Sequence, residues 1–215
     1  MTALAPQLTN ILENFKKNAP APVQKSIYTA NTDFKAAYDR SAAIQDGDNL
    51  PGFRLTNAVG KEVTSTELLA QGPLLITFYR GEWCPFCNLA LRAMQKHLDE
   101  LKARNVTFVA ITPELPDTTL STTEKNGLEF TVLSDVGNKY ARELGILFQQ
   151  PDTLRPIFDK FGHDLKKRNG DDSFALPIPA TLLVDQKGIV RNTFIEPDYT
   201  KRLEPSEALR WIDAL

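Results

Sequence analysis

The chain has 215 residues, of which 42% are hydrophobic and 24% charged, and its formal net charge is −2. This length suffices for one well-filled domain plus an appendage, and the nearly balanced charge argues against nucleic acid or an anionic membrane as a partner. No stretch approaches the ~18 consecutive apolar residues that a membrane-spanning helix requires.

The N-terminal segment and the number of cysteines indicate the cellular compartment in which the protein is expected. The chain begins MTALAPQLTNILENFKK, which lacks the basic start and long apolar run of a secretory signal and the arginines of a mitochondrial presequence. Its two cysteines cannot form a disulfide scaffold for a domain of this size. We therefore expect a cytoplasmic protein whose thiols cycle between reduced and oxidised states.

Residues 1–46 are predicted to form a helical extension. Apolar side chains recur at helical spacing over residues 4–15, and the prolines of NAPAPV end that helix. A second helical stretch covers about 23–44, and the turn cluster GDNLPG at 47–52 follows it. The main domain is therefore assigned to residues 47–215. The extension either packs on that domain or forms a contact in a homodimer, and the sequence does not separate the two.

Strands and helices alternate along the main domain. Continuous apolar runs, typical of a sheet covered on both faces, predict strands at 73–79, 106–112 and 129–135. Helical patterns predict helices at 88–104, 118–126, 138–147 and 153–168. An antiparallel hairpin over 180–195 and a C-terminal helix opened by Pro205 complete the chain. The order of elements predicts an α/β sandwich around a mixed sheet.

Both cysteines lie in the stretch FYRGEWCPFCN, residues 78–88. Cys84 comes shortly after a predicted strand and directly before a helix, where unpaired N–H groups and the positive helix end favour an anion. We therefore expect the pKa of Cys84 to be lowered from its usual value of ~8.5. Pro85 suits the first helical position. Cys87 lies under the same turn and can attack a sulfur bonded to Cys84, and Arg80 adds a positive charge nearby.

Four segments carry a resemblance to known proteins. EWCPFC after an apolar strand resembles the active-site turn of the thioredoxin superfamily, in a form similar to that of glutaredoxins. GDNLPGFRLTNAVGKEV, FTVLSDVGNKYARELGI and PATLLVDQKGIVRNTFI resemble the peroxiredoxin-like branch, which includes alkyl hydroperoxide reductase and thiol-specific antioxidant proteins. The resemblance implies a thioredoxin-like three-layer sandwich with a mixed central sheet, preceded here by the helical extension.

The resemblance also implies a substrate-binding surface around the cysteines. In thioredoxin-like proteins a cis-proline faces the cysteine pair and its neighbouring backbone binds substrate, and Pro179, preceded by Ile178, occupies that position. On the cysteine side the expected substrate-binding residues are Arg80, Trp83, Pro85 and Phe86.

Two positions depart from the peroxiredoxin pattern. Typical members place a threonine three residues before the reactive cysteine and an arginine near the start of the late strand, and together these polarise the peroxide. Here the two positions hold Gly81 and Pro179. Arg80 and Arg191 are the candidate substitutes for the arginine.

The leading functional hypothesis is a thiol-dependent peroxidase. Cys84 would be the exposed nucleophile and Cys87 the resolving thiol, with thioredoxin, glutaredoxin or glutathione as reductant. No metal, flavin or nucleotide is expected, because the chain has no glycine-rich phosphate loop and offers only one close pair of zinc ligands. The alternatives are a thiol–disulfide reductase and a redox-sensing binding protein whose N-terminal helices contact a partner. The insertion over 148–176, which contains His163, is placed to cover the site.

Overall fold

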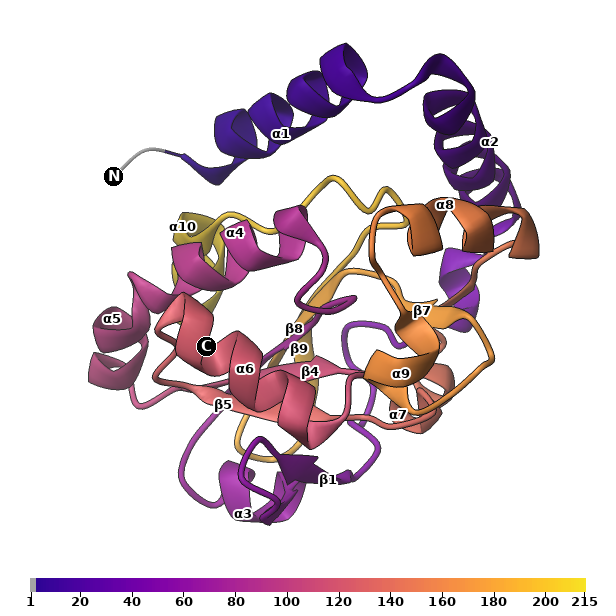
Figure 1. Ribbon diagram of the computed structural model, residues 1–215. Helices are drawn as coiled ribbons and strands as arrows, with labels where there is room; N and C mark the ends of the chain where they lie inside the picture. The colour runs from indigo at the N-terminus through magenta and orange to yellow at the C-terminus, as the bar shows by residue number, and fades with distance from the viewer. Residues whose placement is uncertain (1–2) are drawn as a thin grey trace.

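A seven-stranded mixed sheet forms the centre of the molecule, in the order β2-β1-β5-β4-β3-β8-β9 (Figure 1). The structure is a computed structural model and describes residues 3–215. β3, β4 and β5 run parallel, and the remaining neighbours in the sheet are antiparallel. The strands are β1 (Arg54–Asn57), β2 (Glu62–Thr64), β3 (Leu74–Phe78), β4 (Thr107–Thr112), β5 (Thr131–Ser134), β8 (Ala180–Val184) and β9 (Val190–Ile195).

Helices cover both faces of this sheet. Successive residues of β3 point to opposite faces, so Leu75 packs in one apolar cluster while Leu74 and Ile76 pack in the other. The first cluster includes side chains of α4 (Pro85–Gln95), α5 (Leu98–Ala103) and α10 (Pro205–Ile212), and the second those of α3 (Ser65–Leu69) and α7 (Lys139–Glu143). The predicted three-layer sandwich is therefore present. Among the described residues, no helix is both long and apolar enough to cross a membrane.

The N-terminal helices pack on the rest of the chain. α1 (Leu4–Asn18) lies against α4, and α2 (Ala21–Ala37) reaches the region of α8 (Arg155–Lys160), so that together they arch over one end of the molecule (Figure 1). Leu4 and Leu8 are buried in the same cluster as the cysteines, and burial of a leucine contributes roughly 1.5–3 kcal/mol. The extension thus contributes directly to the core beneath it.

Several predicted helices are broken in the structure. The helix expected over 88–104 starts earlier, at Pro85, and divides into α4 and α5 around His97. The helix expected over 153–168 consists of a 3-10 turn η2 (Asp152–Leu154), α8 and α9 (Leu165–Asn169), since Gly162 takes a positive φ of 75° between α8 and α9. α6 (Pro116–Asn126) begins two residues before its predicted start at 118.

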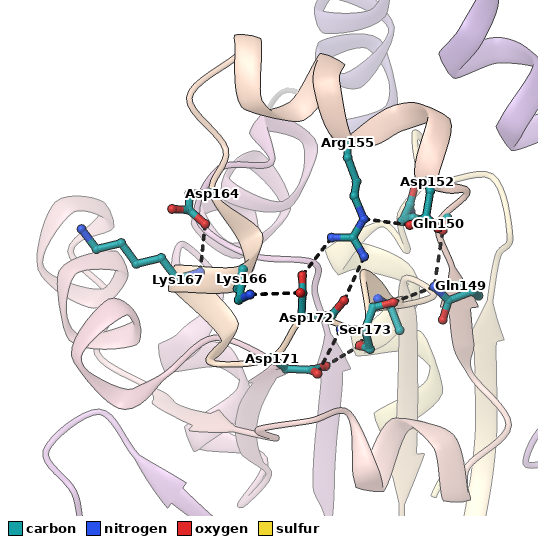
Figure 2. A network of polar contacts seen from close by, with 11 residues as sticks. Gln149, Gln150, Asp152, Arg155, Asp164, Lys166, Lys167, Asp171, Asp172 and Ser173 are labelled. Carbon is teal, nitrogen blue, oxygen red and sulfur yellow. Dashed lines mark hydrogen bonds and ion pairs between the residues drawn. The ribbon is translucent and has the colours of Figure 1, made fainter.

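Four short strands were not predicted, because none is longer than four residues and an alternating pattern needs more. Two of them, β6 (Leu147–Gln149) and β7 (Ala175–Pro177), pair antiparallel at the base of the insertion. Inside the insertion, Arg155 donates to Asp152 (2.7 Å) and Asp172 (3.1 Å), and Lys166 donates to Asp172 (3.0 Å) (Figure 2). These contacts join the start of α8 to η2 and to the loop after α9.

Candidate active site

Cys84 is the N-cap residue of α4, directly after the loop that follows β3. Pro85 is the first helical residue, as predicted, and the Cys84 carbonyl accepts from the N–H groups of Cys87 and Asn88, both at 3.1 Å. Both thiols are free and both are buried, Cys84 being 1% exposed and Cys87 0%. The prediction that Cys84 is an exposed nucleophile is therefore wrong for this state, because α1, α2 and α8 cover the helix end that the sequence alone would leave open.

The two sulfurs share one negative charge. Burial by itself raises the pKa of Cys87, but the hydrogen bond from Cys84 and the charges of Arg202 and Arg80 outweigh it and lower that pKa to about 5. Burial and the hydrogen bond to Cys87 raise the pKa of Cys84. The direction for Cys84 is thus opposite to the one expected, and the lowered pKa of the pair is that of Cys87, three residues further on.

Arg202 is the cation nearest to this thiolate. Its Nη2 donates to Cys87 Sγ at 3.0 Å, and its Nη1 donates to the carbonyls of Tyr199 and Lys201, each at 2.6 Å. Sequence reasoning missed it, since Arg202 lies 115 residues beyond Cys87 in an irregular loop. Arg191, one of the two predicted substitutes, instead donates to Asp185 (2.6 Å) and has no contact with the cysteines.

Arg80, the other predicted substitute, is part of the site. Its guanidinium is buried between two rings, 4.8 Å from the centre of Trp83 and 4.7 Å from that of Tyr199. A desolvated cation between aromatic faces is stabilised by their quadrupoles. Arg80 therefore places a fixed positive charge beside Cys84, whose pKa it lowers against the larger effect of burial.

The place of the family threonine is filled by other groups. Gly81 has a φ of 142°, and a Cβ on it would lie 2.5 Å from Trp83 Nε1 and 2.8 Å from Glu114 Oε1. Glu114 is fully buried, accepts from the Glu82 N–H (2.9 Å) and faces Arg168 (3.5 Å). Burial raises the pKa of Glu114 to about 7. A titratable carboxylate and an indole N–H thus occupy the space where a side chain at position 81 would project.

An apolar cavity of about 200 Å³ lies over Cys84. The predicted residues Arg80, Trp83, Pro85 and Phe86 all line it. The remaining lining comes from α1, α2, the insertion and the loop after β9: Ile11, Leu12, Phe15, Ile27, Phe158, Phe161, His163 and Tyr199. The insertion therefore does cover the site, and its His163 lies 5.2 Å from the Trp83 ring, where burial lowers the pKa of the imidazole.

Ile178 and Pro179 do not line this cavity. The peptide bond before Pro179 is trans, so the predicted cis-proline is wrong. The Pro179 carbonyl accepts from the Glu196 N–H (3.2 Å), and the next residue, Ala180, pairs with Ile195 in the sheet, so the chain runs extended into β8. Ile178 is buried in the cluster on the face of the sheet opposite to the cysteines.

Comparison with known proteins identifies relatives of the main domain. Residues 47–193 match the model of the AhpC/TSA family. Peroxiredoxin Bcp of Escherichia coli (strain K12) is 29% identical over 103 residues, which cover 48% of this chain and 65% of that protein. The chloroplastic peroxiredoxin Q of Gentiana triflora is 30% identical over 105 residues, covering 49% of this chain and 48% of that one. The match thus covers slightly less than two thirds of the first relative's length and about half of the second's.

Solved structures show the same fold. Peroxidoxin BcpB from Mycobacterium tuberculosis superposes with a TM-score of 0.63 at 18% identity, covering 80% of this chain and 98% of that one. Enterococcus faecalis AhpC superposes with a TM-score of 0.62 at 18% identity, covering 79% and 90%. The thioredoxin-like fold expected from the sequence is therefore confirmed.

Proposed function

The chain belongs to the AhpC/TSA family, and from that premise we propose that it is a thiol-dependent peroxidase that reduces hydroperoxides with Cys84 and Cys87. The arrangement of the two free thiols carries the proposal: Cys84 lines an apolar cavity, while Cys87 accepts a hydrogen bond from Arg202 and has a lowered pKa. A thiolate held beside fixed positive charge is the nucleophile that such a reaction requires.

The reaction begins with a proton transfer inside the pair. Cys84 lines the cavity and meets the substrate first, while Cys87 lies beneath it against Arg202. The proton of the Cys84 thiol passes along the hydrogen bond to the Cys87 thiolate. The resulting Cys84 thiolate attacks the terminal oxygen of the hydroperoxide, the O–O bond breaks, and the alkoxide leaves to be protonated to the alcohol.

Cys87 then resolves the sulfenic acid. Its sulfur attacks Cys84, an S–S bond forms, and the hydroxide that leaves takes up the proton of Cys87. One thiol, one thiolate, one hydroperoxide and the proton that solvent supplies to the alkoxide thus give a disulfide, an alcohol and water. The pair is one helical turn apart, so the bond forms without unfolding α4. An external thiol such as thioredoxin, glutaredoxin or glutathione restores the pair by disulfide exchange, and a cytoplasmic setting would supply any of the three. A homodimer through the N-terminal helices stays a prediction.

Rapid mixing tests the peroxidase. Reduced protein is mixed with hydrogen peroxide and, separately, with an oxidised model disulfide, and the fluorescence of Trp83 reports oxidation. We expect fast oxidation by peroxide that is lost in Cys84→Ser, whereas Cys87→Ser still forms a sulfenic acid that a dimedone probe traps. Slow reaction with peroxide and fast exchange with the disulfide would instead establish a disulfide reductase, and two slow reactions would leave the redox-sensing hypothesis.

A further inference from the structure

One charged residue of the loop between β3 and α4, residues 79–84 and here called the cysteine loop, has no part in the proposed reaction. Glu82 lies two residues before Cys84, and its side chain is only 13% exposed. Burial raises the pKa of Glu82, but the hydrogen bonds and charges of Lys125 and Arg168 outweigh it and lower that pKa. A largely buried carboxylate that stays charged is costly unless it is well paired, so its partners indicate its role.

Each polar group of Glu82 has a partner from a different element. Its N–H donates to Glu114 (2.9 Å), in the loop after β4, and its carbonyl accepts from the side chain of Asn88 on α4 (2.6 Å). One carboxylate oxygen accepts from Lys125 of α6, and the other accepts from Arg168 of α9 at 3.2 Å. Glu82 thus joins the cysteine loop to three helices and to the end of the central strand β4.

The cysteine loop also determines the surroundings of the thiolate. The Cys84 N–H donates to the Gly81 carbonyl (3.1 Å), so Glu82 lies inside a single turn that ends at Cys84. Burial raises the pKa of Cys87, and the charge of Arg80 and a hydrogen bond from its backbone are among the effects that lower it. Because Arg80 lies only two residues before Glu82, a displacement of Glu82 would move Arg80 relative to the sulfurs.

The insertion over 148–176 reaches the cysteine loop through Arg168. Besides its pair with Glu82, the Arg168 guanidinium lies 3.5 Å from Glu114, and its carbonyl accepts from the Leu115 N–H (2.8 Å). The Arg168 side chain is 27% exposed, so water screens these ion pairs less than it screens pairs on the open surface. The position of α9 and that of the cysteine loop are therefore coupled.

We propose that Glu82 is a positioning residue for the cysteine pair. Held between Lys125 and Arg168, it fixes the cysteine loop and makes the reactivity of the pair depend on the docking of the insertion. The chemical consequence rests on the proposed function, since the pair that Glu82 positions is the one that reduces the hydroperoxide. The positioning itself requires no substrate.

Two substitutions of opposite charge distinguish positioning from a direct effect of charge. If charge acted alone, loss of the negative charge in Glu82→Gln would lower the pKa of the thiolate, and loss of the positive charge in Arg168→Gln would raise it. Positioning predicts that both variants raise this pKa, by about half a unit to one unit, because each releases the cysteine loop. The ultraviolet absorbance of the thiolate in reduced protein, recorded as a function of pH, measures the change without any peroxide.

A double variant and a matched control complete the test. In Glu82→Gln/Arg168→Gln the shift should be close to that of either single variant, because all three lack the same ion pair. Arg155→Gln should leave the pKa unchanged, since Arg155 lies in the same insertion but pairs with Asp152 and Asp172 (Figure 2). Opposite shifts in the two single variants, no shift in Glu82→Gln, or an equal shift in Arg155→Gln would each overturn the proposal.

Consumption of hydrogen peroxide by the wild-type protein separates the two proposals. A wild-type protein that consumes no peroxide, with parallel shifts in both single variants, keeps the positioning role of Glu82 and refutes the peroxidase. A wild-type protein that consumes peroxide, with opposite shifts in the variants, keeps the peroxidase and refutes the positioning role.

Discussion

The charge state of the cysteine pair depends on two arginines that reach it in different ways. Arg80 belongs to the same loop as Cys84 and is fixed between Trp83 and Tyr199. Arg202 comes from the far end of the chain and donates directly to Cys87. The thiolate is thus stabilised by one arginine from its own loop and one from near the C-terminus, although burial opposes it.

Replacing Arg202 should therefore raise the pKa of the thiolate. In Arg202→Gln we expect the pKa of Cys87 to rise from about 5 by about 1 to 2 units, since an adjacent opposite charge typically shifts a pKa by that much. The measurement is the ultraviolet absorbance of the thiolate as a function of pH. Arg191→Gln is the matched control, because Arg191 pairs with Asp185 away from the site. An unchanged titration in Arg202→Gln would show that Arg202 has no influence on the pair.

Glu114 should make the stability of the fold fall as pH rises. Its pKa is about 7 in the folded state and near 4.5 ordinarily, so between these values the folded state keeps a proton that the unfolded state has lost. The contribution of Glu114 to the free energy of unfolding is therefore fully present below pH 4.5 and is lost as the pH rises through 7. Glutamine does not titrate, so in Glu114→Gln this pH-dependent part of the stability, at most about 3 kcal/mol, should disappear.

Denaturant unfolding at about pH 5 and about pH 8 measures this difference. The wild-type protein is expected to lose more stability between the two than Glu114→Gln does, and the exposed Glu124→Gln serves as the control. If wild type and Glu114→Gln change equally with pH, Glu114 is not the group that titrates.

The site residues that the sequence could predict are those close to Cys84 in the chain. Trp83, Pro85 and Phe86 belong to the cysteine motif, so strand, turn and helix place them together without further information. Glu114 comes from the loop after β4, and Tyr199 and Arg202 come from the loop after β9, and no spacing rule relates them to Cys84. The burial of Cys84 was also beyond prediction, because it depends on how α1 and α2 pack.

At the scale of elements, the N-terminus of α1 is capped from the far end of the chain. The Glu204 carboxylate accepts from the N–H of Leu4 (2.9 Å) and of Ala5 (2.6 Å), while α1 has no side-chain cap of its own. A negative group here satisfies unpaired donors and interacts favourably with the helix dipole. The sequence predicted this helix from its periodicity, but its cap lies 200 residues away.

Glu204→Ala should loosen α1 without unfolding the sheet. Loss of the cap is expected to cost about 1–2 kcal/mol of local stability, because the N–H groups of Leu4 and Ala5 lose their acceptor. Hydrogen exchange followed by mass spectrometry should show faster exchange at the start of α1 and unchanged exchange in β3 and β4. Glu13→Ala, on the exposed surface of the same helix, is the comparison. Equal exchange in both variants would mean that Glu204 does not hold the helix.

At the scale of the whole molecule, residues 198–204 connect the cysteines to both N-terminal helices. Arg202 donates to Cys87, Glu204 caps α1, and Asp198 pairs with Lys35 of α2. Residues 1–46 are proposed as an extension of the main domain, but they are not structurally independent of it. The segment 198–204 links their helices to the cysteine pair.

Oxidation should accordingly loosen the extension. Formation of the Cys84–Cys87 disulfide removes the negative charge that holds Arg202, so the segment 198–204 loses its charge-assisted hydrogen bond to α4. We expect faster hydrogen exchange in α1 and α2 of the oxidised protein than of the reduced protein, with no change in α3, on the opposite face of the sheet. Arg202→Gln, already lacking the contact, should show the fast exchange in both redox states. Equal exchange in oxidised and reduced wild-type protein would show that the packing of α1 and α2 does not depend on the redox state of the cysteines. The part of the cavity over Cys84 that these helices line would then be the same in both states.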